Sequence, residues 1–320
     1  MQGFPPAFPV GKPLCFLTNT LFYDGGHKMK ITASMVKDLR TKTGAGMMDC
    51  KKALVEADGD MEKAVDILRE KGLSQAAKKA SRVAAEGAVV SAISADGKTG
   101  ALVEVNCETD FVGSNDDFKA LASSIANQIL ATNPADVEAL LASDMNGKSV
   151  KDTVTEAVAK IGENISVRRF VRYESAEGKV YSYIHGGGKI GVLVEMKGAD
   201  DELGKDIAMQ VAAANPSYLD RTQVPQAEID HEKEVLAVEA RNEGKPEKII
   251  EKMVIGRINK FYKEVCLVDQ EFIKDGDLTI SKLLKSKNAA VLRFTRYQLG
   301  EGIEKKQDDL AAEVAKQLNQ

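Results

Sequence analysis

The chain has 320 residues, of which 43% are hydrophobic and 29% are charged, and its formal net charge is −4. This balance is typical of a soluble globular protein with room for two or three domains. The mild acidity, the 5% aromatic content and the absence of Trp argue against a broad nucleic-acid-binding face, and no apolar run reaches the ~20 residues of a membrane span. We therefore expect a cytoplasmic protein without a nucleic-acid or membrane partner.

The first 28 residues differ from the rest of the chain. They contain four prolines and four phenylalanines, carry almost no charge and follow neither a helical nor a strand period. A secretory signal would need a basic start and a small-residue cleavage site. Gly25-Gly26 can instead be encoded by a ribosome-binding sequence two codons before Met29. We interpret residues 1–28 as a disordered extension upstream of the true start at Met29.

Residues 29–82 predict a small helical domain followed by a basic linker. Thr32 can cap a first helix, and Gly44-Ala45-Gly46 separates this helix from a second one. The turn at residues 58–60 leads into a third helix with Val65 and Leu68 on one face. Three short helices of this size resemble a ubiquitin-associated module, and residues 75–82 would form a basic helical linker.

Met47 and Met48 open the second of these helices, close to Leu39 and Arg40. Two consecutive residues at a helix start cannot both face the core, so at least one Met should be exposed. The adaptable side chain of Met suits a binding surface. The alternative is that both residues fill the core of a small domain.

Residues 83–174 and 175–298 predict two copies of one unit. Segments 85–91 and 100–105 recur 91 positions later with closely similar sequences. Each pair of segments predicts a hairpin of two strands. In both copies a helical segment that ends at Asn-Pro follows, and then an alternating segment that predicts a third strand.

The two copies differ by insertions. The first copy has nine extra residues around residues 109–114, between its second strand and its helix. The second copy contains two charged helical segments across about residues 226–266, which predict an antiparallel helical hairpin. With a final helix in a C-terminal module at residues 299–320, the predicted class is α+β with antiparallel sheets.

No segment predicts a catalytic centre. Gly97-Lys98-Thr99 and Gly147-Lys148-Ser149 resemble the end of a phosphate-binding loop but lack its earlier glycine. The glycine-rich segment 186–191 lies between two strands, so no helix N-terminus would face a pyrophosphate. Four scattered Cys and three His form no metal or triad pattern. We therefore expect buried reduced thiols, no metal, no cofactor and no enzymatic activity.

The insertion in the first copy contains Thr109, Asp110, Phe111 and Val112. The core does not need this segment, because the second copy folds without it. A Phe beside an acid, followed by turn-forming residues, suits a wedge that enters a partner; alternatively, Phe111 folds back over its own subdomain. His185, at the tip of the second hairpin, is either a turn residue or a further contact.

Residues 29–318 closely resemble elongation factor Ts. The motifs that carry the resemblance occur in one order along the chain: residues 37–54, 104–112, 160–165, 185–194 and 300–305. The resemblance implies a guanine nucleotide exchange factor that binds the GTPase elongation factor Tu, promotes exchange of GDP for GTP and can take part in a higher-order complex with it. The residues before Met29 are a departure from the family pattern.

The resemblance also implies roles for individual residues. The residues matching Asp110 and Phe111, between Thr109 and Val112, insert between helices of the GTPase and disturb its magnesium site. Those matching Leu39, Arg40, Met47 and Met48 grip another helix near the guanine-binding side, and the residue matching His185 belongs to a further contact surface.

Two other functions remain open from the sequence. A ubiquitin-associated-like adapter would bind a different partner through residues 29–82 and would have no exchange activity. A nucleotide-binding enzyme is the second alternative, and the incomplete phosphate loops argue against it.

Overall fold

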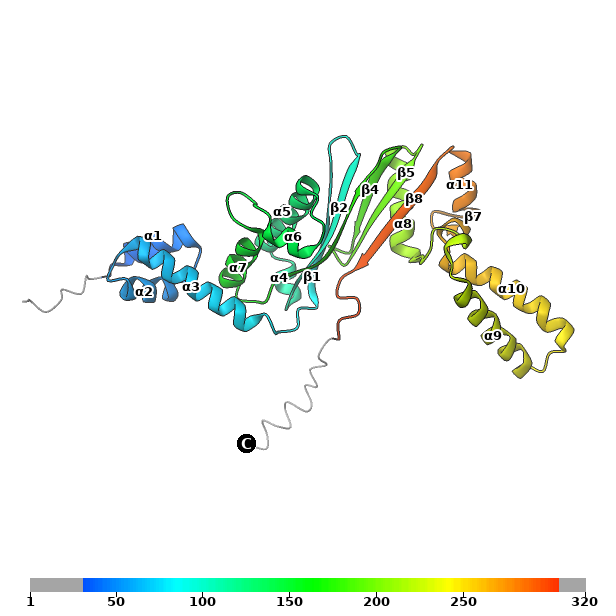
Figure 1. Ribbon diagram of the computed structural model, residues 1–320, viewed down its shortest axis with the longest axis horizontal. Helices are drawn as coiled ribbons and strands as arrows, with labels where there is room; N and C mark the ends of the chain where they lie inside the picture. Colours follow the sequence, from blue (N-terminus) through cyan, green and yellow to red (C-terminus); the bar gives the residue numbers. More distant parts are fainter. Residues whose placement is uncertain (1–30, 305–320) are drawn as a thin grey trace, which may run out of the picture.

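The computed structural model describes residues 31–304. These residues form an elongated molecule with three helices at one end, two three-stranded sheets in the middle and a pair of long helices at the other end (Figure 1). The combination of helices with antiparallel sheets confirms the predicted α+β class. The extension at residues 1–28, the start at Met29 and the helix expected after residue 304 lie outside the described residues.

The three N-terminal helices are α1 (Ala33–Thr43), α2 (Met47–Glu56) and α3 (Met61–Lys79). Thr32 caps α1 by accepting a hydrogen bond from the Met35 N–H, as predicted. Gly44 ends α1 in the left-handed conformation, with φ of 69°, which glycine adopts without steric cost. The helices enclose a small apolar core that consists of Val36, Leu39, Cys50, Ala53, Leu54, Ala57 and Ala64.

Helix α3 differs from the prediction because it continues without a break into the expected linker. Gly72 lies inside it, where a glycine costs about 1 kcal/mol relative to Ala. The close crossing of α3 with α7 (Val150–Ile161) explains this glycine, because a Cβ at position 72 would lie 3.0 Å from the Ala159 Cβ. The helix therefore joins the N-terminal helices directly to the first sheet and its helices.

The two sheets have the same topology. The first consists of β1 (Glu86–Ile93), β2 (Thr99–Cys107) and β3 (Ser166–Glu174), and the second of β4 (Lys179–His185), β5 (Ile190–Lys197) and β8 (Ala290–Gln298). All pairings are antiparallel, and the middle strand of each sheet has a register shift at the same place, at Glu104/Val105 and at Glu195/Met196. The strands predicted from the repeated segments are confirmed.

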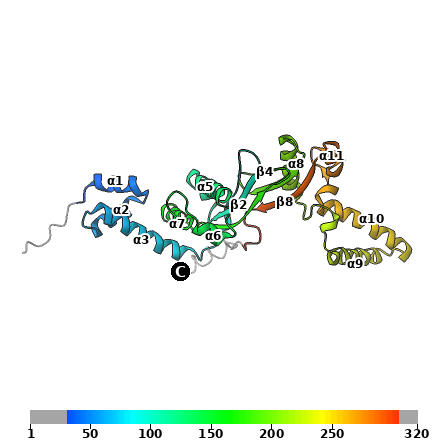
Figure 2. The same ribbon diagram turned by 45° about the horizontal axis from the view of Figure 1, so that its top comes forward.

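Helices cover the outer faces of the sheets. Helix α5 (Asp116–Thr132) lies on the first sheet and α8 (Asp201–Ala214) on the second, so that the two sheets face each other between helices (Figures 1 and 2). Both helices end at an Asn in the left-handed conformation, Asn133 and Asn215, each with φ of 46°. The predicted Asn-Pro stops are therefore confirmed.

The facing sheets make reciprocal contacts. The Val89 N–H donates to the Gly188 carbonyl and the Val180 N–H to the Gly97 carbonyl, both at 2.8 Å. Val180 is the equivalent of Val89, and Gly188 the equivalent of Gly97, each 91 positions later. Each sheet therefore donates the same hydrogen bond to the other. The Ser91 and Ser182 hydroxyls, also equivalent, lie 3.0 Å apart. These contacts relate the two sheets by a local two-fold axis.

The third strands of the two sheets also make reciprocal contacts. The Arg169 guanidinium lies over the Tyr297 ring at 4.3 Å, and the equivalent Arg293 lies over Tyr173 at 4.1 Å. Each Arg also binds a glutamate of its own sheet, Arg169 to Glu104 at 2.7 Å and Arg293 to Glu195 at 2.6 Å. Each such cation–π contact is worth about 0.5–2 kcal/mol, and more as it becomes desolvated.

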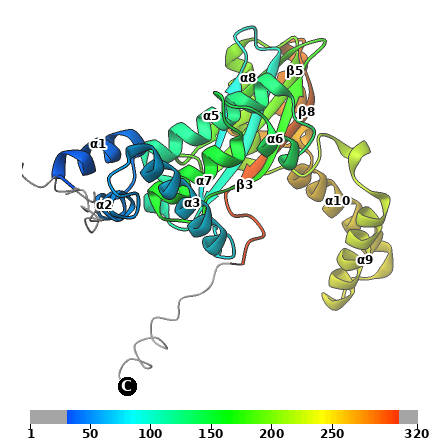
Figure 3. The same cartoon turned by 60° about the vertical axis from the view of Figure 1, so that its left-hand side comes forward.

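The second half of the chain contains elements without a counterpart in the first. Helices α9 (Gln226–Asn242) and α10 (Glu247–Val265) lie side by side and extend away from the sheets (Figures 1 and 3). They are joined by ion pairs of Arg257 with Glu239 and Glu243. A short hairpin of β6 (Glu271–Phe272) and β7 (Asp275–Thr279), then α11 (Ile280–Ser286), leads into β8.

Like β6, β7 and α11, several other elements were not predicted from the sequence. In the first half these include α6 (Val137–Ala142) and α7, and in the second the single turns η1 (Arg221–Gln223) and η2 (Leu267–Asp269). Helix α7 contributes Val150, Val154 and Val158 to the core beneath the first sheet.

Glu104 and its counterpart Glu195 are not fully equivalent, because Glu104 accepts hydrogen bonds from more partners. Its side chain is fully buried and accepts hydrogen bonds from Arg168, Arg169 and the Gly300 N–H. Burial opposes ionisation, but these hydrogen bonds outweigh it and hold the pKa of the Glu104 carboxyl below its ordinary value. The stability that this charge contributes is therefore present at neutral pH and is lost as pH falls through the lowered pKa.

We expect Glu104→Gln to lower the free energy of unfolding by about 3 kcal/mol at pH 7, because it removes a fully buried carboxylate charge that pairs with two partly buried guanidinium groups. The difference from the unmodified chain should shrink as the pH falls through the lowered pKa of Glu104 and this carboxyl itself becomes protonated. Urea unfolding across this pH range measures both effects. Glu195→Gln is the matched control, and an equal or larger loss in that variant would contradict the special role of Glu104.

Candidate functional site

The insertion after β2 forms α4 (Asp110–Gly113), a single helical turn. Thr109 caps this turn with its hydroxyl, which accepts from the Val112 N–H at 3.3 Å. Phe111 is 85% exposed, Asp110 is also exposed, and Val112 packs against the core. Phe111 therefore does not fold back over its own subdomain in the free chain, and the turn presents an aromatic ring and a carboxylate to the solvent.

The base of this turn is held from two sides. The Glu163 carboxylate accepts hydrogen bonds from the Glu108 N–H at 3.1 Å, the Thr109 N–H at 3.0 Å and the Thr109 hydroxyl at 2.7 Å. On the other side, Gly113 approaches β1 so closely that a Cβ at this position would lie 2.9 Å from the Gly87 carbonyl oxygen. The turn is therefore fixed in the chain before any partner arrives.

Cys107 lies next to this turn but has no thiolate chemistry. Burial, assisted by the nearby charge of Glu163, raises the pKa of the Cys107 thiol to about 12. The protonated sulfur donates to the Thr109 carbonyl at 3.1 Å. Cys50 and Cys266 are also buried and free, so the prediction of reduced thiols is confirmed for these three residues, and Cys15 lies outside the described residues.

The N-terminal helices present a second candidate surface. Met47 and Met48 are 55% and 62% exposed, which confirms the expectation that at least one of them faces outward. Arg40 is exposed, whereas Leu39, which the sequence interpretation placed in the same surface, is fully buried in the core of the three helices and cannot touch a partner in this conformation. The sequence interpretation missed Val55, which is 51% exposed and follows Met48 at the seven-residue spacing that places two residues on one helix face.

His185 lies exposed at the end of β4, stacked on Tyr183 with a ring separation of 6.1 Å. The glycine-rich segment that follows is a hairpin turn, as predicted. In this turn a Cβ on Gly188 would lie 2.9 Å from the Cβ of Ala88 in β1. Gly87, the residue before Ala88, contacts Gly113 of α4. One end of β1 therefore brings the turn after His185 close to α4.

The segments that resemble phosphate-binding loops have structural roles. Lys98 extends from the β1–β2 turn and donates to the Gly178 carbonyl at 2.8 Å. Ser149 caps α7, and Lys148 pairs with Glu156 of that helix at 2.6 Å. Neither lysine is arranged around an anion cradle.

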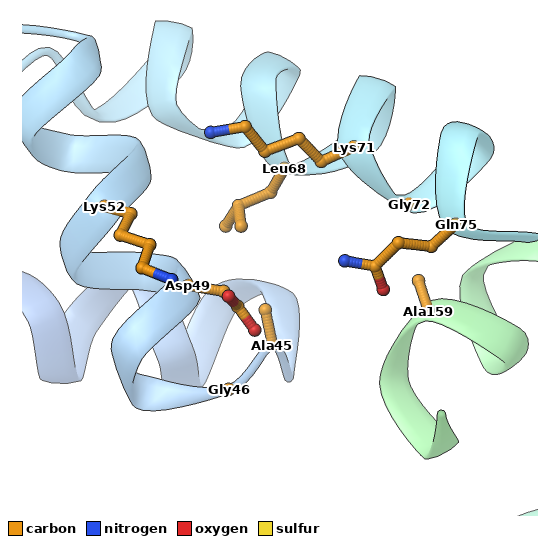
Figure 4. Close-up of a pocket in the computed structure, with 9 residues that line it drawn as sticks. All are labelled: Ala45, Gly46, Asp49, Lys52, Leu68, Lys71, Gly72, Gln75 and Ala159. Carbon is orange, nitrogen blue, oxygen red and sulfur yellow. The ribbon is translucent and has the colours of Figure 1, made fainter. Parts of the chain in front are cut away.

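A cavity of about 270 Å³ lies where the N-terminal helices meet α7 (Figure 4). Its lining consists of Ala45, Gly46, Asp49, Lys52, Leu68, Lys71, Gly72, Gln75 and Ala159. The lining combines small residues with acidic and basic side chains, which is typical of a junction between packed helices. In residues 31–304 we find no cluster of His, Cys, Asp and Glu suited to a metal ion, and no helix with the length and apolar character of a membrane span.

The exposure of Phe111 leads to a prediction about stability. We expect Phe111→Ala to change the free energy of unfolding by less than about 0.5 kcal/mol, because the ring makes little contact with the fold. Phe118→Ala is the matched control on the adjacent helix, since Phe118 is fully buried and its loss should cost about 3–5 kcal/mol. Urea unfolding distinguishes the two, and a large loss for Phe111→Ala would show that the ring supports its own subdomain.

Comparisons with known proteins place the chain in one family. Residues 108–301 match the family model described as Elongation factor TS. Three relatives named Elongation factor Ts are similar over nearly their whole length. The protein of Clostridium acetobutylicum is 56% identical over 303 residues, which is 91% of this chain and 99% of the relative. The protein of Clostridium perfringens is 54% identical over 298 residues (89% and 98%), and that of Clostridium botulinum is 54% identical over 300 residues (90% and 99%). The chain therefore belongs to the elongation factor Ts family.

Proposed function

We propose that this chain is a translation elongation factor that binds the GTPase elongation factor Tu and promotes the exchange of GDP for GTP. The observation that carries the proposal, beside the family membership, is the exposed Asp110-Phe111 turn on a fixed base. The chain would act by binding alone, without catalysing a chemical step, in the cytoplasm where translation takes place.

Exchange by a binding protein follows from thermodynamic linkage. A factor can expel a nucleotide when it binds the empty GTPase more tightly than the loaded one, and the nucleotide then expels the factor to the same extent. Magnesium bridges nucleotide phosphates to protein oxygens and neutralises their charge. A contact that displaces this ion or its ligands therefore weakens nucleotide binding without competing for the nucleotide pocket itself.

The turn at residues 110–113 suits this action. Phe111 would enter between helices of the GTPase, and Asp110 would bring a negative charge towards the magnesium site. Thr109 caps the turn and Val112 anchors it in the core. Burial of one Phe is worth about 1.5–3 kcal/mol, or roughly tenfold to a hundredfold, so this contact alone does not account for tight binding.

The remaining affinity would come from other surfaces. We propose that Arg40, Met47 and Met48, supported by Leu39, grip a helix of the GTPase, and that His185 belongs to a third contact. This assignment divides the chain into a helical domain at 29–82, α+β subdomains at 83–174 and 175–298 with the helical hairpin at about 226–266, and a C-terminal module at 299–320.

We expect Phe111→Ala to slow the stimulated release of GDP by about tenfold or more, as the loss of one buried aromatic contact requires. The measurement is the release of a fluorescent GDP analogue from elongation factor Tu at saturating concentrations of the variant. Unchanged release rates would refute the role of the wedge.

A different kinetic effect is expected from the N-terminal surface. Met47→Ala combined with Met48→Ala should raise the concentration that gives half-maximal release by about tenfold, because apolar contact area is lost, while the maximal rate changes little. Titration of the variant in the same release assay tests this expectation. If the isolated helices at residues 29–82 bound a partner fully and the complete chain gave no release, the adapter function would hold instead.

A further inference from the structure

Glu163 lies in the loop between α7 and β3, and its side chain is directed to the turn that carries Phe111. Its two carboxylate oxygens accept three hydrogen bonds, from the N–H groups of Glu108 and Thr109 and from the Thr109 hydroxyl. A carboxylate is the side chain that can accept several such bonds without having to donate one. Charge-assisted hydrogen bonds of this kind are also stronger than neutral ones.

The connection is made in both directions. The Glu108 carboxylate accepts from the Asn164 N–H at 2.6 Å, and it also lies 3.5 Å from Arg82. The Asn164 side chain donates to the Arg82 carbonyl at 2.9 Å. The turn before α4, the loop after α7 and the end of the linker are thus joined in one network that leaves α4 little freedom to move.

The helix that precedes Glu163 also holds the N-terminal helices. Ala159 contacts Gly72 of α3, and the Lys160 side chain lies against Gly44, the residue that ends α1 (Figure 4 shows the contact at Ala159). Arg69 of α3 approaches Asp152 of α7 at 4.0 Å. Helix α7 therefore lies between the surface around Met47 and Met48 and the turn with Phe111.

We propose that Glu163 is a positioning residue for exchange. Its carboxylate fixes the Thr109 turn so that Phe111 and Asp110 point outward at a defined place relative to the N-terminal methionines. This inference rests on the proposed function, because the turn matters only if it enters a partner. Glu163 itself, half-buried beneath the turn, does not need to touch the GTPase.

A positioning role and a general structural role give different kinetics. If Glu163 acts through the turn alone, its removal lowers the maximal release rate and leaves the half-maximal concentration, which depends on the N-terminal grip, nearly unchanged. In a chain that already carries Phe111→Ala the ring is absent, so removal of the Glu163 carboxylate should not lower the maximal rate much further. A general loss of structure would instead lower the rate in both backgrounds by the same factor.

The experiment measures fluorescent GDP release from elongation factor Tu with Glu163→Ala, alone and combined with Phe111→Ala. We expect Glu163→Ala to lower the maximal rate by about tenfold, in keeping with the loss of hydrogen bonds to a charged group. In the Phe111→Ala background the further loss should be less than about twofold. An unchanged rate, or an equal loss in both backgrounds, would overturn the proposal.

Two variants and a second readout keep the test interpretable. Glu156→Ala removes a carboxylate from α7, the helix that precedes the loop of Glu163. Glu156 makes an exposed ion pair with Lys148, so this variant should leave release unchanged. Glu163→Gln keeps the size of the side chain but turns an amide N–H₂ towards N–H donors, so this variant should also give slower GDP release. A release rate equal to that of the unmodified chain would count against the proposal.

Hydrogen exchange separates this inference from the proposed function. In Glu163→Ala and Glu163→Gln the amides of residues 108–113 should exchange faster, while those of the β-sheets keep their protection. If the unmodified chain does not accelerate GDP release, the proposed function fails, and exchange confined to residues 108–113 still reports that Glu163 holds the turn. If those amides are unaffected, the positioning role fails even when the chain is an active exchange factor.

Discussion

The close contact between the two sheets is the constraint on which the rest of the structure depends. Gly100 and Gly191 are equivalent residues at this contact, and a Cβ on Gly100 would lie 2.6 Å from a methyl group of Val180. Both sheets supply an equivalent arginine and tyrosine, so the Arg–Tyr contact of one copy is matched by that of the other. The sheets are thereby locked into one body, from which the N-terminal helices and the α9–α10 hairpin extend in opposite directions.

A symmetric body cannot by itself present two different surfaces to a partner. The differences come from the insertions, because α4 has no counterpart in the second half and α9 with α10 has none in the first. Even the shared glutamates have diverged, since Glu104 also holds the Gly300 N–H and Glu195 does not. The ring of the proposed wedge, Phe111, is exposed and not part of the core, so packing places little constraint on it.

The repeat made most of the sheet structure predictable. Strands that recur at a fixed spacing, an Asn-Pro pair after each helix and two charged helical segments were all visible in the sequence. The predictions failed where tertiary contacts decide. The third N-terminal helix was expected to end before the linker but continues through Gly72, which the crossing with Ala159 explains, and Leu39 was grouped with Met47 and Met48 although it is buried. Glu163 could not be identified because its importance lies in donors 54 and 55 residues away.

An exposed Phe on a fixed turn is an unfavourable arrangement for the free chain that favours binding. The ring remains hydrated until a partner covers it, so the gain from its burial is available in full at the interface. Because Glu163 and Thr109 already hold the turn, the proposed insertion of the ring into a partner would cost little conformational entropy. The contact is nevertheless small, and a nucleotide can reverse it by competing through the same linkage. Rigidity of the base and smallness of the wedge together fit a factor that must both open its partner and leave it.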